Sequence, residues 1–331
     1  MINPPILTVE DLKVHFAIRQ GMLSRVRAHV HAVDGVSFSL DKGQTIGIVG
    51  ESGCGKTTTG LAILNLVTPT GGRIRYRDED ITGFKHIDRP RVMALRKQLQ
   101  IVFQDPYSSL NPRMTLNQIV GVPMKIHGLY PGRERRERIA YILERVGLDP
   151  GHGNHYPHEF SGGQRQRIGI ARALSINPEV IIGDEPVSAL DVSIQAQIIN
   201  LLMDLQDEFD LSYVIIAHDL AVVEHVSDRI LVMYLGKVVE NAPYDALYDN
   251  PRHPYTKALL SAVPIPDPRA RNRRIDLEGD VPSPLKPPEG CAFHPRCQQR
   301  TERCSREVPE LTLAGDGHWV ACHHQEGCGL H

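Results

Sequence analysis

The sequence lacks a long hydrophobic run. Within its 331 residues, no uncharged apolar stretch approaches the roughly 18 to 20 residues that cross a bilayer as a helix. The opening residues, MINPPILTVEDLKVHF, also lack the basic segment and apolar core of an export signal. We therefore expect a chain that does not cross a membrane by itself and that works in the cytoplasm.

A strong charge of either sign and a repeat of fixed period are also missing. Lys and Arg number 37 and Asp and Glu number 39, which gives a net charge of -2. Proteins whose main partner is nucleic acid usually carry a basic surface, so we expect no nucleic acid. One compact core rarely accounts for a chain of this length, and a large domain with an appended piece is expected.

Apolar patterns predict an α/β fold with a parallel core sheet. Strands are predicted at residues 6–16, 33–40, 44–50, 180–185 and 213–219. The first two form an N-terminal sheet, and residues 17–30 between them read as an insertion. Helical periodicity follows Gly55 and returns at residues 194–209.

Composition divides the chain further. The pattern is helical and charged from about residue 105 to 175, which indicates a helical subdomain inserted into the sheet domain. After Val263 the sequence becomes rich in proline and arginine, as in an irregular linker. We predict one domain at residues 1–262 and an extension at residues 263–331.

The segment GESGCGKT, residues 50–57, matches the pattern G-x-x-x-x-G-K-[ST] between a predicted strand and a predicted helix. Glycines allow backbone N–H groups to surround phosphates, a lysine supplies a point charge, and a threonine hydroxyl ligates Mg²⁺. The predicted ATP contacts are Gly50, Ser52, Gly53, Cys54, Gly55, Lys56, Thr57 and Thr58. A chance match is the alternative, and the strand and helix on either side argue against it.

Two carboxylates, Asp184 and Glu185, end the predicted strand VIIGDE. Ligands bind at the carboxyl ends of strands in open α/β sheets, so these side chains are placed for catalysis. We expect Asp184 to reach the Mg²⁺ shell and Glu185 to polarise the water that attacks the γ-phosphate. The alternative is a solvated acidic turn.

The segment SGGQ precedes the helical stretch RQRIGIARALSI. Its free N–H groups and the Ser161 hydroxyl would form a second anion-binding helix start. A second phosphate-binding site is useful if two molecules face each other and each completes the other's site. The alternative is an ordinary serine N-cap.

The motifs GESGCGKT, IVFQDP, FSGGQRQR, VIIGDEP, SALD and AHD together resemble the nucleotide-binding subunits of ABC transporters across residues 6–262. The resemblance implies a RecA-like core sheet, an antiparallel N-terminal sheet, and a head-to-tail dimer around two ATP molecules. It also implies site residues: Mg²⁺ bound by Thr57, Gln104 and Asp184; ATP contacts from Phe16, Gln104, Ser161, Gly162, Gly163, Gln164 and Asp191; catalysis by Glu185 and His218. Phe16 would stack on adenine, and a core phenylalanine at a strand end is the alternative.

A narrower resemblance is carried by YPHEFSGGQRQRIGIARAL and NPRHPYTKALLSAVP, which look like the F-type ATPases of dipeptide and oligopeptide importers. It implies a heterodimer with a D-type ATPase, two permease subunits and an extracytoplasmic solute-binding protein. The chain would then lie peripherally on the cytoplasmic face of the inner membrane. Nickel and some glycoside or opine importers share this sequence class, so the transported solute stays open.

The tail carries Cys291, Cys297, Cys304 and Cys322, with Cys328 as a spare. Zinc sites commonly use short C-x-x-C pairs, which are missing here, whereas an iron–sulfur cluster reaches more widely spaced cysteines. The tail also resembles those of peptide-importer ATPases, some of which hold a [4Fe–4S] cluster. Zinc, and thiols without any ligand, remain as alternatives.

Two other functions are alternatives to the transporter ATPase. A soluble ABC-type ATPase of DNA repair with a cysteine-ligated metal module is the runner-up, and the slightly acidic net charge disfavours it. A small nucleotide kinase would leave SGGQ, SALD and the tail unexplained.

Overall fold

The computed structural model describes residues 4–20, 25–84, 87–263 and 275–324. Cys328 lies outside these ranges. The chain divides into two compact units. The first unit contains residues 1–40, 46–83 and 217–331, and the second contains residues 41–45 and 84–216.

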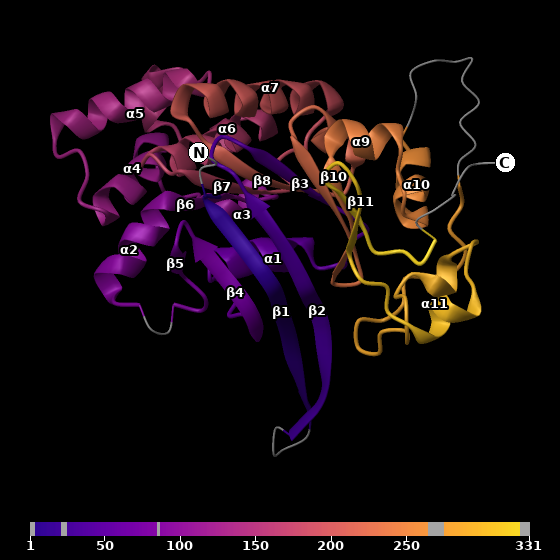
Figure 1. The fold of residues 1–331 in the computed structure, drawn as a ribbon. Helices are drawn as coiled ribbons and strands as arrows, with labels where there is room; N and C mark the ends of the chain where they lie inside the picture. Colours follow the sequence, from indigo (N-terminus) through magenta and orange to yellow (C-terminus); the bar gives the residue numbers. More distant parts are fainter. Residues whose placement is uncertain (1–3, 21–24, 85–86, 264–274, 325–331) are drawn as a thin grey trace, which may run out of the picture. The chain divides into compact units, whose positions relative to one another are not determined.

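The N-terminal sheet of the first unit is antiparallel, with strand order β2-β1-β4-β5. Its strands are β1 (Leu7–Gln20), β2 (Arg25–Leu40), β4 (Gly71–Tyr76) and β5 (Glu79–Asp80). The predicted strands are confirmed, and both continue into the predicted insertion at residues 17–30. Ile18 pairs with Ala28 and Phe16 with Val30, so residues 17–20 and 25–30 extend the hairpin that Figure 1 shows projecting from the sheet. Its β-branched residues favour strands over a loop.

The first unit also holds the strand, loop and helix that the glycine motif predicts. Strand β3 (Thr45–Val49) is buried throughout and pairs in parallel with β9 (Arg229–Tyr234), and helix α1 (Lys56–Ile63) follows the loop. Strand β10 (Lys237–Pro243) is antiparallel to β9. The short helices after these strands are α8 (Leu220–Glu224), α9 (Tyr244–Asp249) and α10 (Pro254–Ser261).

The tail is less irregular than its composition predicts. It contains η3 (His294–Arg296), α11 (Glu302–Arg306) and a hairpin of β11 (Thr312–Gly315) and β12 (His318–Val320). Strand β12 pairs with β10, so the hairpin extends the edge of the sheet, as the yellow strands beside β10 show in Figure 1. Strands this short acquire stability from their partners, which explains why their own sequence does not reveal them.

In the second unit, three parallel strands lie in the order β8-β7-β6. These are β6 (Leu99–Val102), β7 (Val180–Asp184) and β8 (Ser212–Ala217). Every residue of β7 and β8 is buried, as expected for strands covered on both faces.

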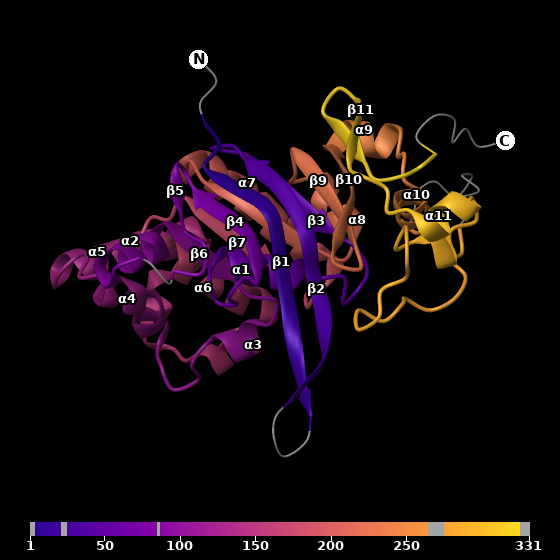
Figure 2. The ribbon, with the colours of Figure 1, turned by 60° about the horizontal axis from the view of Figure 1, so that its bottom comes forward.

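Helices make up most of the remainder of the second unit, as Figure 2 shows for α2, α4 and α5. They are α2 (Arg89–Gln98), α3 (Pro106–Ser109), α4 (Leu116–Ile126), α5 (Arg133–Arg145), η1 (Pro150–Asn154), η2 (Pro157–Glu159), α6 (Gly162–Leu174) and α7 (Val192–Phe209). Helix α2 was not predicted, because its apolar residues are few. No helix among the described residues is long and apolar enough to span a membrane.

Candidate functional site

The predicted site residues divide between the two units. The first unit contributes the glycine loop, Phe16 and His218, and the second contributes Gln104, Asp184, Glu185, the segment 161–164 and Asp191. Each half has its own geometry.

The glycine loop is tightly packed against backbone. Gly55, which begins helix α1, has φ 106°, and a Cβ there would lie 2.1 Å from the carbonyl oxygen of Ala32. Only glycine fits such an approach. The loop is therefore held in shape by its neighbours.

Lys56 lies inside the loop. Its Nζ donates to the carbonyl oxygens of Gly50 at 2.6 Å and Glu51 at 3.1 Å, and the side chain is buried. Cys54 is buried 4.0 Å from that Nζ, and burial raises the pKa of its thiol. Cys54 is therefore a small neutral filler, and Lys56 places a positive charge inside the loop.

Phe16 is 43% exposed on strand β1, so the alternative of a core phenylalanine is wrong. Ile18 and Val26 on the same hairpin are 39% and 50% exposed. An exposed aromatic ring is available for stacking on a base. The adenine contact itself remains a prediction.

His218 is exposed and lies between β8 and α8. The next residue, Asp219, caps α8 by accepting a hydrogen bond from the Ala221 amide at 2.9 Å. The backbone at His218 is thus fixed by a helix cap, while its side chain lies at the surface.

In the second unit, Gln104 and Glu185 meet at the carboxyl edge of the parallel strands. Gln104 Nε2 donates to Glu185 Oε2 at 2.7 Å and lies 3.4 Å from Ser188 Oγ. Strand pairing aligns Val102 with Gly183, so the residues just beyond each strand emerge side by side. The sequence predicted both residues, but their contact appears only in the structure.

Glu185 has an unusual backbone. Its φ is 47°, in the left-handed region that residues other than glycine rarely adopt. Its N–H donates to the Ile216 carbonyl at 2.9 Å, which holds this conformation in place. Strained residues of this kind concentrate at functional sites. Asp184, the last residue of β7, is buried beside it.

Ser161 caps helix α6 in a reciprocal arrangement. Its Oγ accepts from the Gln164 amide at 3.3 Å, and Gln164 Oε1 accepts from the Ser161 amide at 2.9 Å. A serine cap is thus present, and the remaining N–H groups of the first turn still make this helix start suitable for an anion.

The SALD segment packs against the start of α6. A Cβ on Gly163 would lie 2.6 Å from Ile194 Cγ2, and one on Gly162 would lie 3.6 Å from Leu190 Cδ2. Asp191, at the N-cap of α7, is exposed next to them. The structure therefore brings together two motifs that the sequence separates.

The four predicted cysteine ligands lie in the described part of the tail. The Cys291 amide donates to the Cys304 carbonyl at 2.8 Å, Cys304 Sγ lies 3.6 Å from His324 Nε2, and the His324 amide donates to Cys322 Sγ at 3.4 Å. Burial raises the pKa of the Cys291 thiol. These contacts gather Cys291, Cys304 and Cys322 in one neighbourhood.

A mononuclear zinc site does not fit this arrangement. Zinc–sulfur bonds of 2.3 Å would place neighbouring sulfurs roughly 3.8 Å apart. Among the described residues, no three ligand atoms of the tail approach one another within 4.8 Å. An iron–sulfur cluster would need thiolates that are farther apart than those of a zinc site and converge on one point. The contacts described for the tail do not show such an arrangement.

Another group of potential ligands lies on the N-terminal hairpin. One ligand atom from each of His15, His31 and Asp34 falls within 4.8 Å of the others. Asp34 Oδ1 lies 3.1 Å from His15 Nε2, while its Oδ2 lies 3.2 Å from Lys237 Nζ. The lysine already offsets the carboxylate charge, so we assign no metal there.

Three residues near the glycine loop were missed by sequence reasoning. Glu51 lies inside the motif at a position that the pattern leaves unspecified, and its partners are Tyr255 and Arg296. The signals that could have found them are the segments NPRHPYTKALLSAVP and FHPRC, to which the sequence analysis gave no part in the nucleotide site.

Family models match two parts of the chain. Residues 33–188 match the ABC transporter family, and residues 239–304 match the C-terminal region of oligopeptide/dipeptide transporters. The first match contains the glycine loop, Gln104, the segment 161–164 and the two carboxylates. The second contains Tyr255, Arg296 and the first three tail cysteines.

Relatives match nearly the whole chain. The oligopeptide transport ATP-binding protein AppF of Bacillus subtilis is 54% identical over 96% of this chain and 97% of its own. The dipeptide transport ATP-binding protein DppF of Escherichia coli is 51% identical over 97% of this chain and 95% of its own.

Solved structures match the fold. CbiO1 of Clostridium perfringens, part of the ABC transporter complex cbiONQ, has a TM-score of 0.63 at 27% identity, over 75% of this chain and 92% of its own. The ATP-binding cassette MJ0796, a dimer bound to ADP and Pi, has a TM-score of 0.62 at 29% identity, over 72% of this chain and 98% of its own. The predicted fold class is confirmed, and this chain belongs to the ATP-binding proteins of the ABC transporter family, in its oligopeptide/dipeptide branch.

Proposed function

We propose that this chain binds and hydrolyses ATP with Mg²⁺ to energise the import of dipeptides or oligopeptides through a membrane ABC transporter. The observation that carries the proposal is the pairing of Gln104 with Glu185 at the strand edge of an ABC ATPase fold. The names of relatives at about 50% identity support the peptide substrate class and favour transport over DNA repair.

The glycine loop would hold the phosphates. Lys56 lies among the loop carbonyls, from which it can turn to the β- and γ-phosphate oxygens. Thr57, Gln104 and Asp184 would hold Mg²⁺, which neutralises charge on the phosphates when bound. Phe16 would stack on adenine from its exposed position on β1.

Glu185 would orient the attacking water. A carboxylate can accept a hydrogen bond from the water as its oxygen approaches phosphorus in line with the leaving oxygen. The amide of Gln104 donates to one carboxylate oxygen and so holds the side chain at the strand edge. His218 would contact the γ-phosphate.

The segment 161–164 and Asp191 would act in a second ATPase molecule. Ser161, Gly162, Gly163 and Gln164 begin helix α6, and the positive end of a helix dipole suits the phosphates bound by a facing partner. Asp191 would cross the dimer seam. We propose a D-type paralogous ATPase as that partner, in a heterodimer with two permease subunits and an extracytoplasmic solute-binding protein.

The domain division proposed is a nucleotide-binding domain at residues 1–262, with its helical subdomain at about 105–175, and an extension at 263–331. The family matches at residues 33–188 and 239–304 support a division into two parts, although the second match begins before residue 263. The chain would lie peripherally on the cytoplasmic face of the inner membrane, because its permease partners lie in that membrane.

Glu185→Gln tests the catalytic assignment. The variant keeps the shape and the hydrogen bond from Gln104 but loses the charge that orients water, so we expect ATP binding to be retained and turnover to fall by about 10³-fold or more. The measurement is steady-state phosphate release by the reconstituted transporter, beside nucleotide binding to the purified subunit. Unchanged hydrolysis would remove Glu185 from the mechanism.

For the tail, we propose that Cys291, Cys297, Cys304 and Cys322 hold a [4Fe–4S] cluster. The tail offers four cysteines at the spacing that the sequence prediction used, and thiolate ligation by four cysteines is the usual arrangement. The tail has little apolar material, so a bound cluster would give it order that its own core cannot.

Anaerobic purification with iron, sulfide and zinc assays tests this proposal, beside a Cys297→Ser variant. We expect iron and sulfide near stoichiometry and broad absorption near 400 nm that the variant loses. Zinc without iron, or no metal at all, would contradict it and leave the ATPase assignment intact.

A further inference from the structure

One residue of the tail reaches the glycine loop. Arg296 Nη1 lies 2.6 Å from Glu51 Oε2, and its Nη2 lies 3.1 Å from Glu51 Oε1. This is the parallel, bidentate geometry in which arginine binds carboxylates most specifically. Only 8% of Arg296 is exposed. The two residues are 245 positions apart, yet both belong to the first unit.

The backbone of Glu51 is held as well as its side chain. The Glu51 amide donates to the Tyr255 hydroxyl at 2.8 Å. The Tyr255 ring packs against Tyr234 at 4.8 Å and against Phe293 at 5.4 Å between centroids. Phe293 precedes Arg296 by a single turn of chain. The conformation of Glu51 thus depends on helix α10, strand β9 and the tail.

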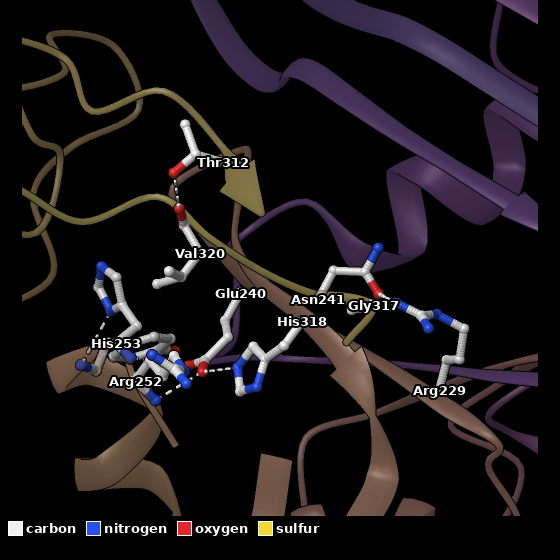
Figure 3. Close-up of polar contacts among 10 residues, drawn as sticks. Arg229, Glu240, Asn241, Arg252, His253, Thr312, Gly317, His318 and Val320 are labelled. Atoms are coloured by element: carbon white, nitrogen blue, oxygen red, sulfur yellow. Dashed lines mark hydrogen bonds and ion pairs between the residues drawn. The ribbon is translucent and has the colours of Figure 1, made fainter. Parts of the chain in front are cut away.

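The position of the tail is itself fixed at the sheet edge. Figure 3 shows Glu240 of β10 pointing toward His318 of β12, at 2.6 Å, with both side chains buried. The amides of Arg252 and His253 donate to the same carboxylate at 2.7 and 3.0 Å. The guanidinium of Arg229 donates to the Gly317 carbonyl at 2.7 Å. Arg296 is therefore presented by an anchored element rather than by a loose end.

Charge explains why such a contact matters at this position. An unpaired carboxylate inside a phosphate-binding loop would repel the phosphates across a short distance. The Arg296 guanidinium offsets that charge, and its hydrogen bonds to Glu51 raise the pKa of Arg296 further above its usual range. Lys56 is then left as the uncompensated charge of the loop.

We propose that Arg296 is a positioning residue for nucleotide binding: through the paired carboxylate of Glu51 it holds the glycine loop in its phosphate-binding shape and cancels the loop's negative charge. The inference rests on the proposed ATP site. It gives the peptide-transporter tail a role in that site, because any change that displaces residues 293–296 would weaken ATP binding.

The test compares wild type, Arg296→Met, Arg296→Met combined with Glu51→Gln, and Arg306→Met in the full-length chain. Arg306 is an exposed arginine of the same tail whose side chain pairs with exposed Glu302 at 3.4 Å, and it serves as the matched control. The readouts are the Kd for MgATP, KM and kcat of the reconstituted transporter, the melting temperature and the iron content.

We expect Arg296→Met to raise Kd and KM by about tenfold, which corresponds to about 1.4 kcal/mol, with kcat at saturating ATP within about twofold. The double variant should recover most of the affinity, because it no longer carries an unpaired charge. Arg306→Met should match wild type. If Arg296→Met does not fold, Arg296→Lys, which keeps the charge but not the bidentate geometry, should raise Kd by about threefold.

Unchanged Kd in Arg296→Met would overturn the proposal. So would a double variant as weak as Arg296→Met with an equal drop in melting temperature, because that result describes a structural anchor only. If wild type itself fails to bind MgATP, the proposed ATP site is wrong, which is a distinguishable outcome.

Discussion

At the scale of single residues, the conformation of the glycine loop is constrained by the space that neighbouring atoms leave at each glycine. The carbonyl of Ala32 occupies the place of a Cβ at Gly55, whereas a Cβ at Gly53 would meet nothing within 4 Å. Both glycines have positive φ, 106° and 79°. Glycine is therefore required at position 55 by the close contact with Ala32, whereas at position 53 it is favoured only by the left-handed backbone conformation.

We predict that Gly55→Ala lowers the free energy of unfolding by roughly 3 kcal/mol, from strain plus a backbone clash. Gly53→Ala should lower it by about 1 kcal/mol, since only the left-handed conformation is disfavoured. Denaturant unfolding of the two variants beside wild type measures the difference. Equal losses would mean that the contact with Ala32 does not constrain the loop.

At the scale of elements, a buried polar network joins β10, β12 and the start of α10. His253 caps α10 by accepting from the Tyr255 amide at 3.1 Å, and burial lowers the pKa of His253 from 6.5 to about 4. Burial alone would raise the pKa of Glu240, but hydrogen bonds from His318 and from the Arg252 and His253 amides lower it overall. Both groups therefore bind fewer protons when folded than when unfolded.

The free energy of unfolding should therefore fall as the pH falls. A lowered pKa in the folded state gives stability that is present above the unfolded pKa and is lost as pH falls toward the folded value. For His253 the window runs from pH 6.5 down to about 4. We predict a loss of about 2 kcal/mol between pH 7 and pH 5 from this residue.

His253→Asn is the matched variant, because asparagine retains a capping oxygen but does not titrate. Urea unfolding at pH 7 and pH 5 should show a smaller loss for the variant than for wild type. A loss of the same size in both proteins would assign the acid sensitivity elsewhere. Glu240 contributes in the same direction, so the variant should still lose some stability.

At the scale of the whole molecule, the residues proposed to bind ATP divide between the two units. The first holds the glycine loop, and the second holds both the paired Gln104 and Glu185 and the helix start at Ser161. In the proposed function, that helix start faces the phosphates of another ATPase molecule. Assembly and ATP binding should then depend on each other.

We predict that ATP converts the Glu185→Gln variant, alone or with its co-expressed partner ATPase, to a dimer of about twice the 36.9 kDa of one chain. Adding Gly162→Asp should prevent this, because the carboxylate would face the partner's phosphates. A Cβ at Gly162 makes only an ordinary 3.6 Å contact with Leu190, so the variant should fold.

Light scattering after size exclusion measures the mass, and AMP should leave both variants monomeric. A Gly162→Asp variant that still dimerises with ATP would remove the segment 161–164 from the interface.

The sequence by itself determined the parts of this protein that depend on local chemistry. The glycine loop, the strand that ends at Asp184 and the serine cap of α6 each combine residue types and spacings that one short stretch of backbone needs. Phosphate binding uses the N–H groups of one short loop and a helix start, so its sequence motif consists of residues close together in the chain.

Only the tertiary structure decided which distant residues meet. Gln104 and Glu185 are 81 positions apart, and Glu51 and Arg296 are 245 apart. The strands of the tail form because β10 offers an edge, and residues 17–20 and 25–30 continue the hairpin because they pair with each other. Such contacts follow from packing between segments, and the local preferences of either segment do not specify its partner.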